Sequence, residues 1–361
     1  MPPVRVLVVD DSVVVRKLLS EALASTPGIQ LAGTASSGAL ALAKIPQLNP
    51  EVITLDIEMP GLNGIQTLQE IRKLYPKLPV IMFSTLSEHG AAITLEALSR
   101  GASDYLAKPT NTESLACAME QVRSELSAKI FALSGRDRQV AVGTRTIALG
   151  KHPAGSSRIE ILAIGTSTGG PNALADVIPR LPERFPVPVV VVQHMPPLFT
   201  RMLAERLNAQ SRIPVHEGEQ GRALEAGQVW IAPGDYHMTV AGNRQQAVLE
   251  LNQDPPENSC RPAVDVLFRS VARIYGPNVL AVVMTGMGSD GARGAAQIRE
   301  TGGEVFVQDE DSSVVWGMPG AVVHSGCANK ICPLPEISQE IVRRVKLGRA
   351  QGTAGAVAAP E

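Results

Sequence analysis

Three aspartates near the N-terminus have the spacing of a phosphate-handling site. Asp10 and Asp11 directly follow the apolar run VRVLVV, and Asp56 ends the run EVITLD. Because the carboxyl ends of parallel strands meet at one edge of a sheet, we expect the three carboxylates to lie together. Such a cluster repels itself unless a cation binds, and oxygen ligands suit Mg²⁺. The pattern therefore predicts a magnesium site in which Asp56 is best placed to attack a phosphoryl group.

A hydroxyl and an ammonium group are expected on the same rim. Ser84 ends the run LPVIMFS, and Lys108 ends SDYLAK just before a proline. Both side chains are suited to binding phosphate oxygens. A lone aspartate after a strand more often caps the helix or turn that follows it. The coordinated set of five residues favours the phosphate site over capping.

A second set of residues has the pattern of a nucleophile turn. The run ILAI leads into GTSTGGP, which satisfies G-x-S-x-G with Ser167 at its centre. Such a serine lies on a sharp strand-to-helix turn, and the N–H groups at the start of the helix can stabilise an oxyanion. A glycine-rich turn can instead bind the phosphate of a nucleotide. The segment lacks both the G-x-G-x-x-G spacing and the lysine of a P-loop, which weighs against that alternative.

A serine nucleophile needs a base and an acid. His194 ends the run VPVVVVQ and is the candidate base, with His237 as the runner-up, although a histidine at the end of a strand is more often structural. Asp290, in MTGMGSDG, is the candidate acid, and Asp265 is a weaker rival that we expect inside a helix starting at Pro262. The order serine, histidine, aspartate differs from the three familiar orders of such triads.

Apolar runs alternate with helical patterns through most of the chain, which predicts an α/β fold with two doubly wound parallel-sheet domains. The first is expected to be flavodoxin-like and to end with a helix over about 113–126, and the second is expected to be Rossmann-like. Polar and small residues between them indicate a linker, and the C-terminal residues are of low complexity. The predicted segments are 1–123 for the first domain, 124–158 for the linker, 159–347 for the second domain and 348–361 for a disordered tail.

Composition restricts the class of partner. The net charge of −2 gives no general attraction to nucleic acid, and no basic helix-turn-helix pattern follows the linker. No apolar run approaches the roughly 20 residues that span a bilayer, and the start MPPVR lacks a signal-peptide pattern. We therefore expect a cytoplasmic protein without membrane insertion. The four cysteines form no C-x-x-C pair and are expected to be reduced thiols, mostly in packing roles; they are Cys117, Cys260, Cys327 and Cys332.

The segments VVDDS, LDIEMPGLNG and AKP, together with Ser84, resemble the response-regulator receiver family at its usual spacings over about the first 123 residues. This resemblance implies an Mg²⁺-dependent phosphorylation with a histidine kinase as the donor. The roles it implies are phosphorylation of Asp56, Mg²⁺ binding by Asp11 and Asp56 with help from Asp10, phosphate contact by Lys108, and a relay through Ser84 and Tyr105.

The segments GTSTGG, QHMP, NSCRPAVDVLF and TGMGSDGARG resemble the chemotaxis protein-glutamate methylesterases, the CheB family. With the receiver, the resemblance extends to about residue 347. It implies a triad of Ser167, His194 and Asp290, oxyanion donors from the Thr168 region and the Met287 N–H, and no cofactor for ester hydrolysis. The implied substrates are γ-glutamyl methyl esters of chemoreceptors, with glutamine deamidation as a second activity. The segment around Arg261 is implied to flank the site.

Two hypotheses remain about how the halves work together. In the first, the receiver covers the hydrolase crevice until phosphorylation of Asp56 shifts the population towards an open arrangement. In the second, the C-terminal half is a catalytically silent module that reports phosphorylation to a partner. The presence of all three triad residues favours the enzyme.

Overall fold

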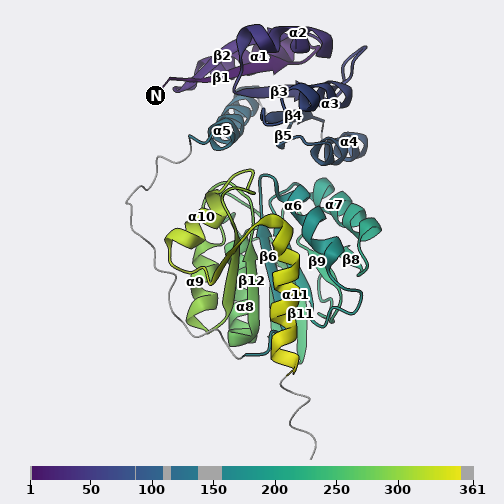
Figure 1. Cartoon of the computed structure of the whole chain (residues 1–361), viewed down its shortest axis with the longest axis vertical. Helices are drawn as coiled ribbons and strands as arrows, with labels where there is room; N and C mark the ends of the chain where they lie inside the picture. Colours follow the sequence, from purple (N-terminus) through teal and green to yellow (C-terminus); the bar gives the residue numbers. More distant parts are fainter. Residues whose placement is uncertain (1, 86, 109–114, 137–156, 351–361) are drawn as a thin grey trace, which may run out of the picture. The chain divides into compact units, whose positions relative to one another are not determined.

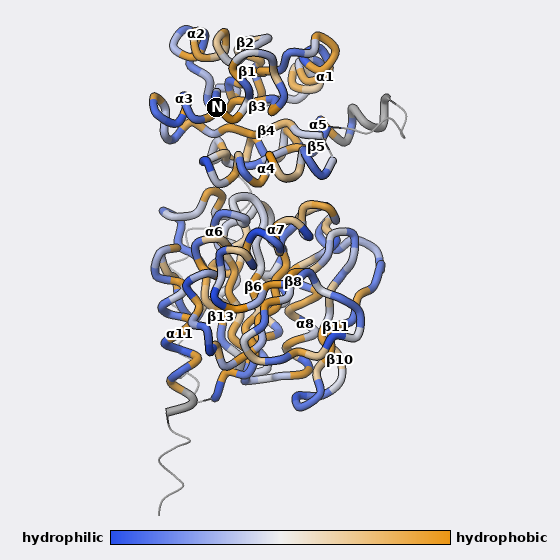
Figure 2. The backbone as a smooth tube through the Cα atoms, turned by 90° about the vertical axis from the view of Figure 1, so that its right-hand side faces the viewer, coloured by the Kyte–Doolittle hydropathy of each residue, from blue (hydrophilic) through white to orange (hydrophobic). Residues whose placement is uncertain are grey.

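The computed structural model describes residues 2–85, 87–108, 115–136 and 157–350. The chain divides into two compact units, residues 1–143 and 144–361, and each has a parallel sheet covered by helices (Figure 1). Hydrophobic residues gather on the strands inside each unit, and hydrophilic residues gather at its surface (Figure 2). None of the described helices is both long and apolar enough to cross a membrane.

In the first unit, five described parallel strands have the order β2-β1-β3-β4-β5. The strands are β1 (Val4–Val9), β2 (Ile29–Ala35), β3 (Val52–Asp56), β4 (Val80–Ser84) and β5 (Asp104–Ala107). The helices are α1 (Val13–Ala24), α2 (Gly38–Leu48), α3 (Gly64–Leu74), α4 (Glu88–Ser99) and α5 (Leu115–Leu133). The chain reverses its direction across the sheet between β1 and β3, so these two strands open the crevice where ligands of such sheets bind.

The second unit has seven described parallel strands in the order β14-β13-β12-β6-β7-β9-β8 and a separate antiparallel hairpin, β10-β11. The strands are β6 (Ile161–Thr166), β7 (Val189–Gln193), β8 (Val215–Glu217), β9 (Val229–Ile231), β10 (His237–Asn243), β11 (Gln246–Asn252), β12 (Val279–Val283), β13 (Glu304–Gln308) and β14 (Lys330–Cys332). The helices are α6 (Gly170–Val177), α7 (Pro197–Gln210), α8 (Val264–Tyr275), α9 (Ala292–Glu300), α10 (Gly317–His324) and α11 (Leu334–Ala350), with short 3-10 helices at Ile178–Arg180 and Gly276–Asn278.

Helices cover both faces of the second sheet, which explains why its central strands consist almost entirely of Val, Ile, Leu and Ala. Apolar residues of α8, α9, α10 and the hairpin share one core cluster with alternate residues of β6, β7, β12 and β13. On the other side, α11 contacts α6, and α6 contacts α7. Two parallel-sheet α/β domains are thus confirmed, whereas the hairpin was not predicted.

Two helices extend further along the chain than expected. The helix α5 continues to Leu133 instead of ending near residue 126, because Leu126 and Ile130 are buried one turn apart in the core of the first unit. The predicted linker therefore begins with helix. At the other end, α11 runs to Ala350, about one turn beyond its last buried position, so 348–350 are helical where a tail was predicted. Residues 137–156 of the predicted linker and residues 351–361 of the predicted tail lie outside the described residues.

Candidate functional sites

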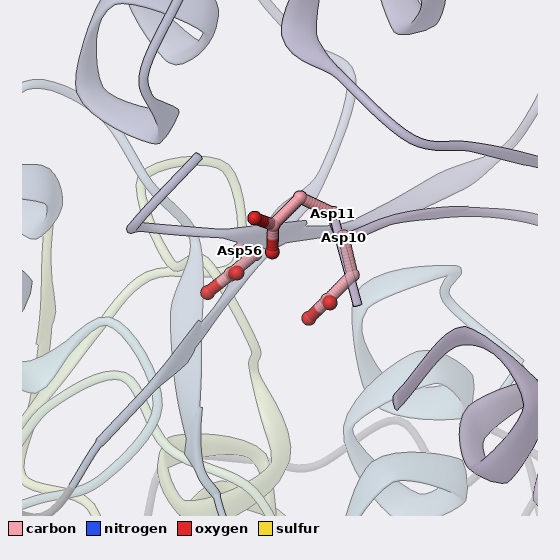
Figure 3. Close-up of side chains that lie close together, drawn as sticks. All are labelled: Asp10, Asp11 and Asp56. Carbon is pink, nitrogen blue, oxygen red and sulfur yellow. The ribbon is translucent and has the colours of Figure 1, made fainter. Parts of the chain in front are cut away.

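The three N-terminal aspartates lie together at the carboxyl edge of the first sheet. Asp56 ends β3, and Asp10 and Asp11 follow the neighbouring strand β1. One carboxylate oxygen from each lies within 4.8 Å of the others, and Figure 3 shows the Asp11 carboxylate turned towards Asp56. Asp10 and Asp56 are buried, while Asp11 is exposed. The cluster is therefore open to solvent on the side of Asp11.

Lys108 supplies part of the compensating charge. Its Nζ lies 2.7 Å from Asp56 Oδ1 and 3.7 Å from Asp10 Oδ2. Burial and the charge of Asp56 still raise the pKa of Asp10 to about 6, and burial raises the pKa of Asp56 against the opposing effect of Lys108. Neither Asp10 Oδ2 nor Asp56 Oδ2 has a hydrogen-bond partner among the described residues. Two buried oxygens beside an exposed carboxylate fit Mg²⁺, which prefers carboxylates, water and phosphate.

The other two residues predicted for this site lie on β4 and β5. The Ser84 hydroxyl accepts a hydrogen bond from Thr94 Oγ1 at 2.7 Å and donates to the Gly90 carbonyl at 3.2 Å, so it faces the start of α4. The Tyr105 ring is buried, with Lys129 Nζ 5.6 Å from its centre. The structure brings Lys108 to the acidic cluster and gives Ser84 and Tyr105 partners elsewhere in the unit.

The second site begins at Ser167, directly after β6. The turn needs glycine twice: Gly169 has a φ of 79°, and a Cβ on Gly170 would lie 1.9 Å from Gln193 Oε1. The helix α6 then starts at Gly170, one residue before the predicted Pro171. Since β6 lies between β7 and β12, Ser167 is at the point where the chain reverses direction across the sheet. Ligands of such sheets bind at this point.

A buried amide ties the serine turn to the next strand. Gln193, the last residue of β7, donates from Nε2 to the carbonyl of Ser167 at 3.0 Å and to that of His194 at 3.2 Å. Its Oε1 accepts a hydrogen bond from Thr166 Oγ1 at 2.7 Å. One side chain thus fixes the backbone at both Ser167 and His194. The sequence reasoning missed this residue, although it belongs to the QHMP segment.

His194 and Asp290 form a close pair, with His194 Nε2 2.8 Å from Asp290 Oδ2. Four further hydrogen bonds hold the Asp290 carboxylate. The donors are the backbone N–H groups of Val264, Asp265 and Gly291 at 2.7, 2.9 and 2.9 Å and the side-chain amide of Asn258 at 2.8 Å. Two of these donors lie in the first turn of α8, where the helix dipole also favours a negative charge. Asp290 is fixed as an ionised hydrogen-bond acceptor.

The pKa values of the pair move in opposite directions. Burial alone lowers the pKa of His194, but the hydrogen bond to Asp290, the contact with Cys260 and the charge of Asp290 more than offset it and raise the pKa of the imidazole. Burial alone raises the pKa of Asp290, yet His194 and the N–H donors of α8 lower it. The carboxylate therefore stabilises a protonated His194, as a base that accepts a proton during a reaction requires.

The second nitrogen of His194 faces a cysteine, since Cys260 Sγ lies 3.5 Å from His194 Nδ1. The Ser167 hydroxyl has no hydrogen-bond partner among the described side chains and backbone groups. Sequence reasoning treated Cys260 as a packing thiol and missed this contact. Cys260 is half-buried, whereas Cys327 and Cys332 are buried; the Cys117 side chain lies outside the described residues.

The two rival residues have structural partners instead. His237, the alternative base, is buried; its Nδ1 accepts a hydrogen bond from the Ala263 N–H at 3.3 Å and its Nε2 lies 3.2 Å from the Pro255 carbonyl. Asp265, the alternative acid, is buried in the first turn of α8, which starts at Val264 and not at Pro262. It accepts a hydrogen bond from the Gly294 N–H at 2.7 Å and helps to begin α9.

The predicted oxyanion donors lie around Ser167. A Cβ on Gly286 would lie 2.8 Å from Ser167 Cβ, so the chain passes the serine just before Met287. The Met287 N–H donates no hydrogen bond to another described residue. Thr168 is buried, and its carbonyl accepts a hydrogen bond from Thr285 Oγ1 at 2.9 Å. Arg261, which was expected to flank the site, pairs with Asp235 at 2.5 Å.

Comparison with known proteins identifies relatives of both units. Residues 162–341 match the CheB methylesterase family, and residues 6–120 match the response regulator receiver domain. A protein-glutamate methylesterase/protein-glutamine glutaminase of Trichodesmium erythraeum is 48% identical, over 96% of this chain and 100% of the relative. One of Nocardioides sp. is 51% identical over 96% of both chains. The crystal structure of the Thermotoga maritima CheB methylesterase catalytic domain has a TM-score of 0.51 at 41% identity, covering 52% of this chain and 99% of that one.

Proposed function

This chain belongs to the CheB methylesterase family, and we propose that it hydrolyses γ-glutamyl methyl esters on chemoreceptors, with Ser167, His194 and Asp290 as its catalytic residues. The observation that carries the proposal is the His194–Asp290 pair at 2.8 Å beside the Ser167 turn. A strand-end serine on a glycine-rich turn, next to an imidazole oriented by a buried carboxylate, is the arrangement that activates a hydroxyl nucleophile.

In this proposal each ring nitrogen of His194 has its own role. Because Nε2 of His194 is bound to Asp290, the proton of the Ser167 hydroxyl goes to Nδ1 as Oγ attacks the ester carbonyl. The N–H of Met287, with donors at the start of α6, stabilises the oxyanion of the tetrahedral intermediate. The protonated His194 then gives its proton to the departing methoxide, and methanol leaves. Water, activated by the same imidazole, hydrolyses the acyl-enzyme and restores Ser167.

The same steps deamidate a glutamine side chain, with ammonia as the leaving group. The curated relatives carry both activities in their name, which supports a protein-glutamine glutaminase activity here. Neither reaction uses a metal or an organic cofactor in this proposal. An amide is a weaker electrophile than an ester and has a poorer leaving group, so general-acid donation from His194 matters more for the glutaminase step.

The first unit is proposed to control the second. A chemotaxis histidine kinase in the cytoplasm supplies the phosphoryl group, and Asp56 accepts it. Mg²⁺ held by Asp10, Asp11 and Asp56 would neutralise the charge that gathers during transfer. Lys108 contacts the new phosphate after leaving its pairing with Asp56. Phosphorylation raises the rate of the hydrolase by shifting the population towards its active state.

The test of the catalytic residues is methanol release from methylated receptor. We expect Ser167→Ala and His194→Gln to lose at least about a thousandfold in rate. Ser289→Ala is a matched control, because this serine is exposed on the same rim and its hydroxyl makes no hydrogen bond to a triad residue. A wild-type rate in Ser167→Ala would contradict the assignment. Labelling of Ser167 by a serine-reactive phosphonate separates an enzyme from a silent binding module.

A further inference from the structure

The active site contains a thiol that the proposed mechanism does not use. Cys260 Sγ lies 3.5 Å from His194 Nδ1, within the distance expected for a hydrogen bond to sulfur. In the neutral form of the ring, the only form that can act as a base, the hydrogen on Nε2 points at the ionised Asp290 carboxylate and Nδ1 carries the lone pair. The thiol is therefore the donor in the contact with Nδ1. This is the same lone pair that must accept the proton of Ser167.

The fold holds this thiol in place from several sides. Cys260 belongs to the segment 257–262, whose Glu257 and Cys260 exchange backbone hydrogen bonds at 3.1 and 2.9 Å. The buried ring of His237 contacts Pro255 before the segment and Ala263 after it. Within the segment, the Arg261 guanidinium pairs with Asp235.

The same segment also reaches the acid of the triad. Asn258 Nδ2 donates to Asp290 Oδ1 at 2.8 Å and to Asp265 Oδ2 at 3.0 Å. Two residues of one short segment thus contact His194 and Asp290. The position of the thiol follows from an anchored loop and not from a freely rotating surface side chain.

Resting on the proposed function, we propose that Cys260 is a positioning residue that competes with Ser167 for His194. When the ring is neutral, its thiol donates to Nδ1 and withholds the base, and it must be displaced before the serine can transfer its proton. No covalent bond to Cys260 forms. Because a thiol is a weak hydrogen-bond donor, the competition slows activation of the serine by about two- to tenfold and does not prevent it.

The test compares Cys260→Ala with the wild-type full chain. A fluorophosphonate reacts covalently with an activated serine, so the second-order rate constant for labelling of Ser167 measures access of its hydroxyl to the base. We expect Cys260→Ala to react about two- to tenfold faster than the wild type. Cys327→Ala is the matched control, because it removes a thiol of the same unit that bonds to the Ser325 carbonyl and not to the triad; its rate should not change. An equal or slower rate for Cys260→Ala would overturn the inference.

A second measurement needs no substitution. In wild-type protein with ¹⁵N-labelled histidine, at a pH at which the His194 ring is neutral, the Nδ1 resonance reports whether its lone pair accepts a hydrogen bond. In the wild type we expect this resonance at the position of a hydrogen-bonded nitrogen. In Cys260→Ala we expect it to shift away from that position. A resonance at the position of an unbonded nitrogen in the wild type would overturn the inference even if Cys260→Ala fails to fold. If the fluorophosphonate does not label Ser167 in the wild type, the proposed function fails and this inference fails with it. If it labels Ser167 in both proteins but no faster in Cys260→Ala, only this inference fails.

Discussion

The two units bury carboxylates in opposite ways. In the first, Asp10 and Asp56 are buried together, and each has one oxygen without a hydrogen-bond partner among the described residues. In the second, Asp265 and Asp290 are also buried neighbours, yet backbone N–H groups and the Asn258 amide satisfy them. Uncompensated buried charge is costly. Within the described part of the chain only Lys108 compensates the first cluster, which leaves room for the Mg²⁺ and phosphoryl group of the proposal, whereas the chain itself completes the second.

This difference matches the roles proposed for the two sites. A site that receives a signal must change its charge or its contacts when the signal arrives. A carboxylate cluster with unsatisfied oxygens favours binding of a cation and a phosphoryl group. A catalytic acid must instead stay fixed, because its task is to orient an imidazole through each cycle. Asp290 is fixed by five hydrogen bonds, two of which come from the start of α8.

Removal of the charge on Asp290 should give the largest effect. We expect Asp290→Asn to lower kcat for methanol release by about ten thousandfold, because His194 loses the carboxylate that orients it and stabilises its cation. Asp265→Asn is the matched control: its carboxylate is equally buried but is linked to the triad only through Asn258 and the nearby charge of Asp290, and we expect a loss of less than about tenfold. Equal losses in the two variants would show that Asp290 acts only through packing.

The same substitution should move the pH profile. Asp290 raises the pKa of His194 above the ordinary histidine value of 6.5, and catalysis needs the neutral ring, so the acid limb of kcat/KM in the wild type should lie above pH 6.5. In Asp290→Asn the raising effect of Asp290 is lost, so burial, which lowers the pKa of His194, is opposed only by Cys260. The limb should therefore move to lower pH. A limb that stays in place would mean that a group other than His194 sets it.

Neutralising the first cluster should stabilise the protein. The pKa of Asp10 is raised from 3.8 to about 6 in the folded protein. The protonated carboxyl therefore contributes its full share to the free energy of unfolding below about pH 4, and this contribution is lost as the pH rises through about 6. Asp10→Asn keeps this position neutral, and at pH 7 without Mg²⁺ it should raise the free energy of unfolding by on the order of 2 kcal/mol. Calorimetry measures this free energy. Both tryptophans, Trp230 and Trp316, belong to the second unit, so tryptophan fluorescence follows the unfolding of that unit separately. Destabilisation at pH 7 would contradict the account.

Magnesium should have a smaller effect confined to the first unit. At ten times its dissociation constant, a bound cation stabilises the folded state by about 1.4 kcal/mol. We expect Mg²⁺ to raise the melting temperature of the first unit in the wild type and not in Asp56→Asn. The unfolding of the second unit, followed by tryptophan fluorescence, should not change. An equal rise in both units would indicate a general salt effect.

The sequence predicts those parts of the structure that depend on local patterns. Apolar runs located the main strands of both sheets, and strand ends located Asp10, Asp56, Ser167 and His194. The β10-β11 hairpin was missed because its polar exposed residues obscure the apolar alternation.

Contacts between distant segments could not be read from patterns. His237 has the same strand-edge placement as His194 in the sequence, and only its burial and its bond from Ala263 show a structural role. Cys260 is 66 residues from His194, and no spacing rule connects the two. The segment NSCRPAVDVLF was the available signal, but its side-chain directions depend on the tertiary fold.

The central claim is that Asp56 controls the hydrolase, and methanol release from methylated receptor tests it most directly. Wild type and Asp56→Asn are compared with Mg²⁺, with and without a small phosphodonor. We predict that the phosphodonor raises the wild-type rate by about fivefold or more and leaves Asp56→Asn at the unphosphorylated rate. Equal activation of both proteins, or no activation of the wild type, would contradict the account.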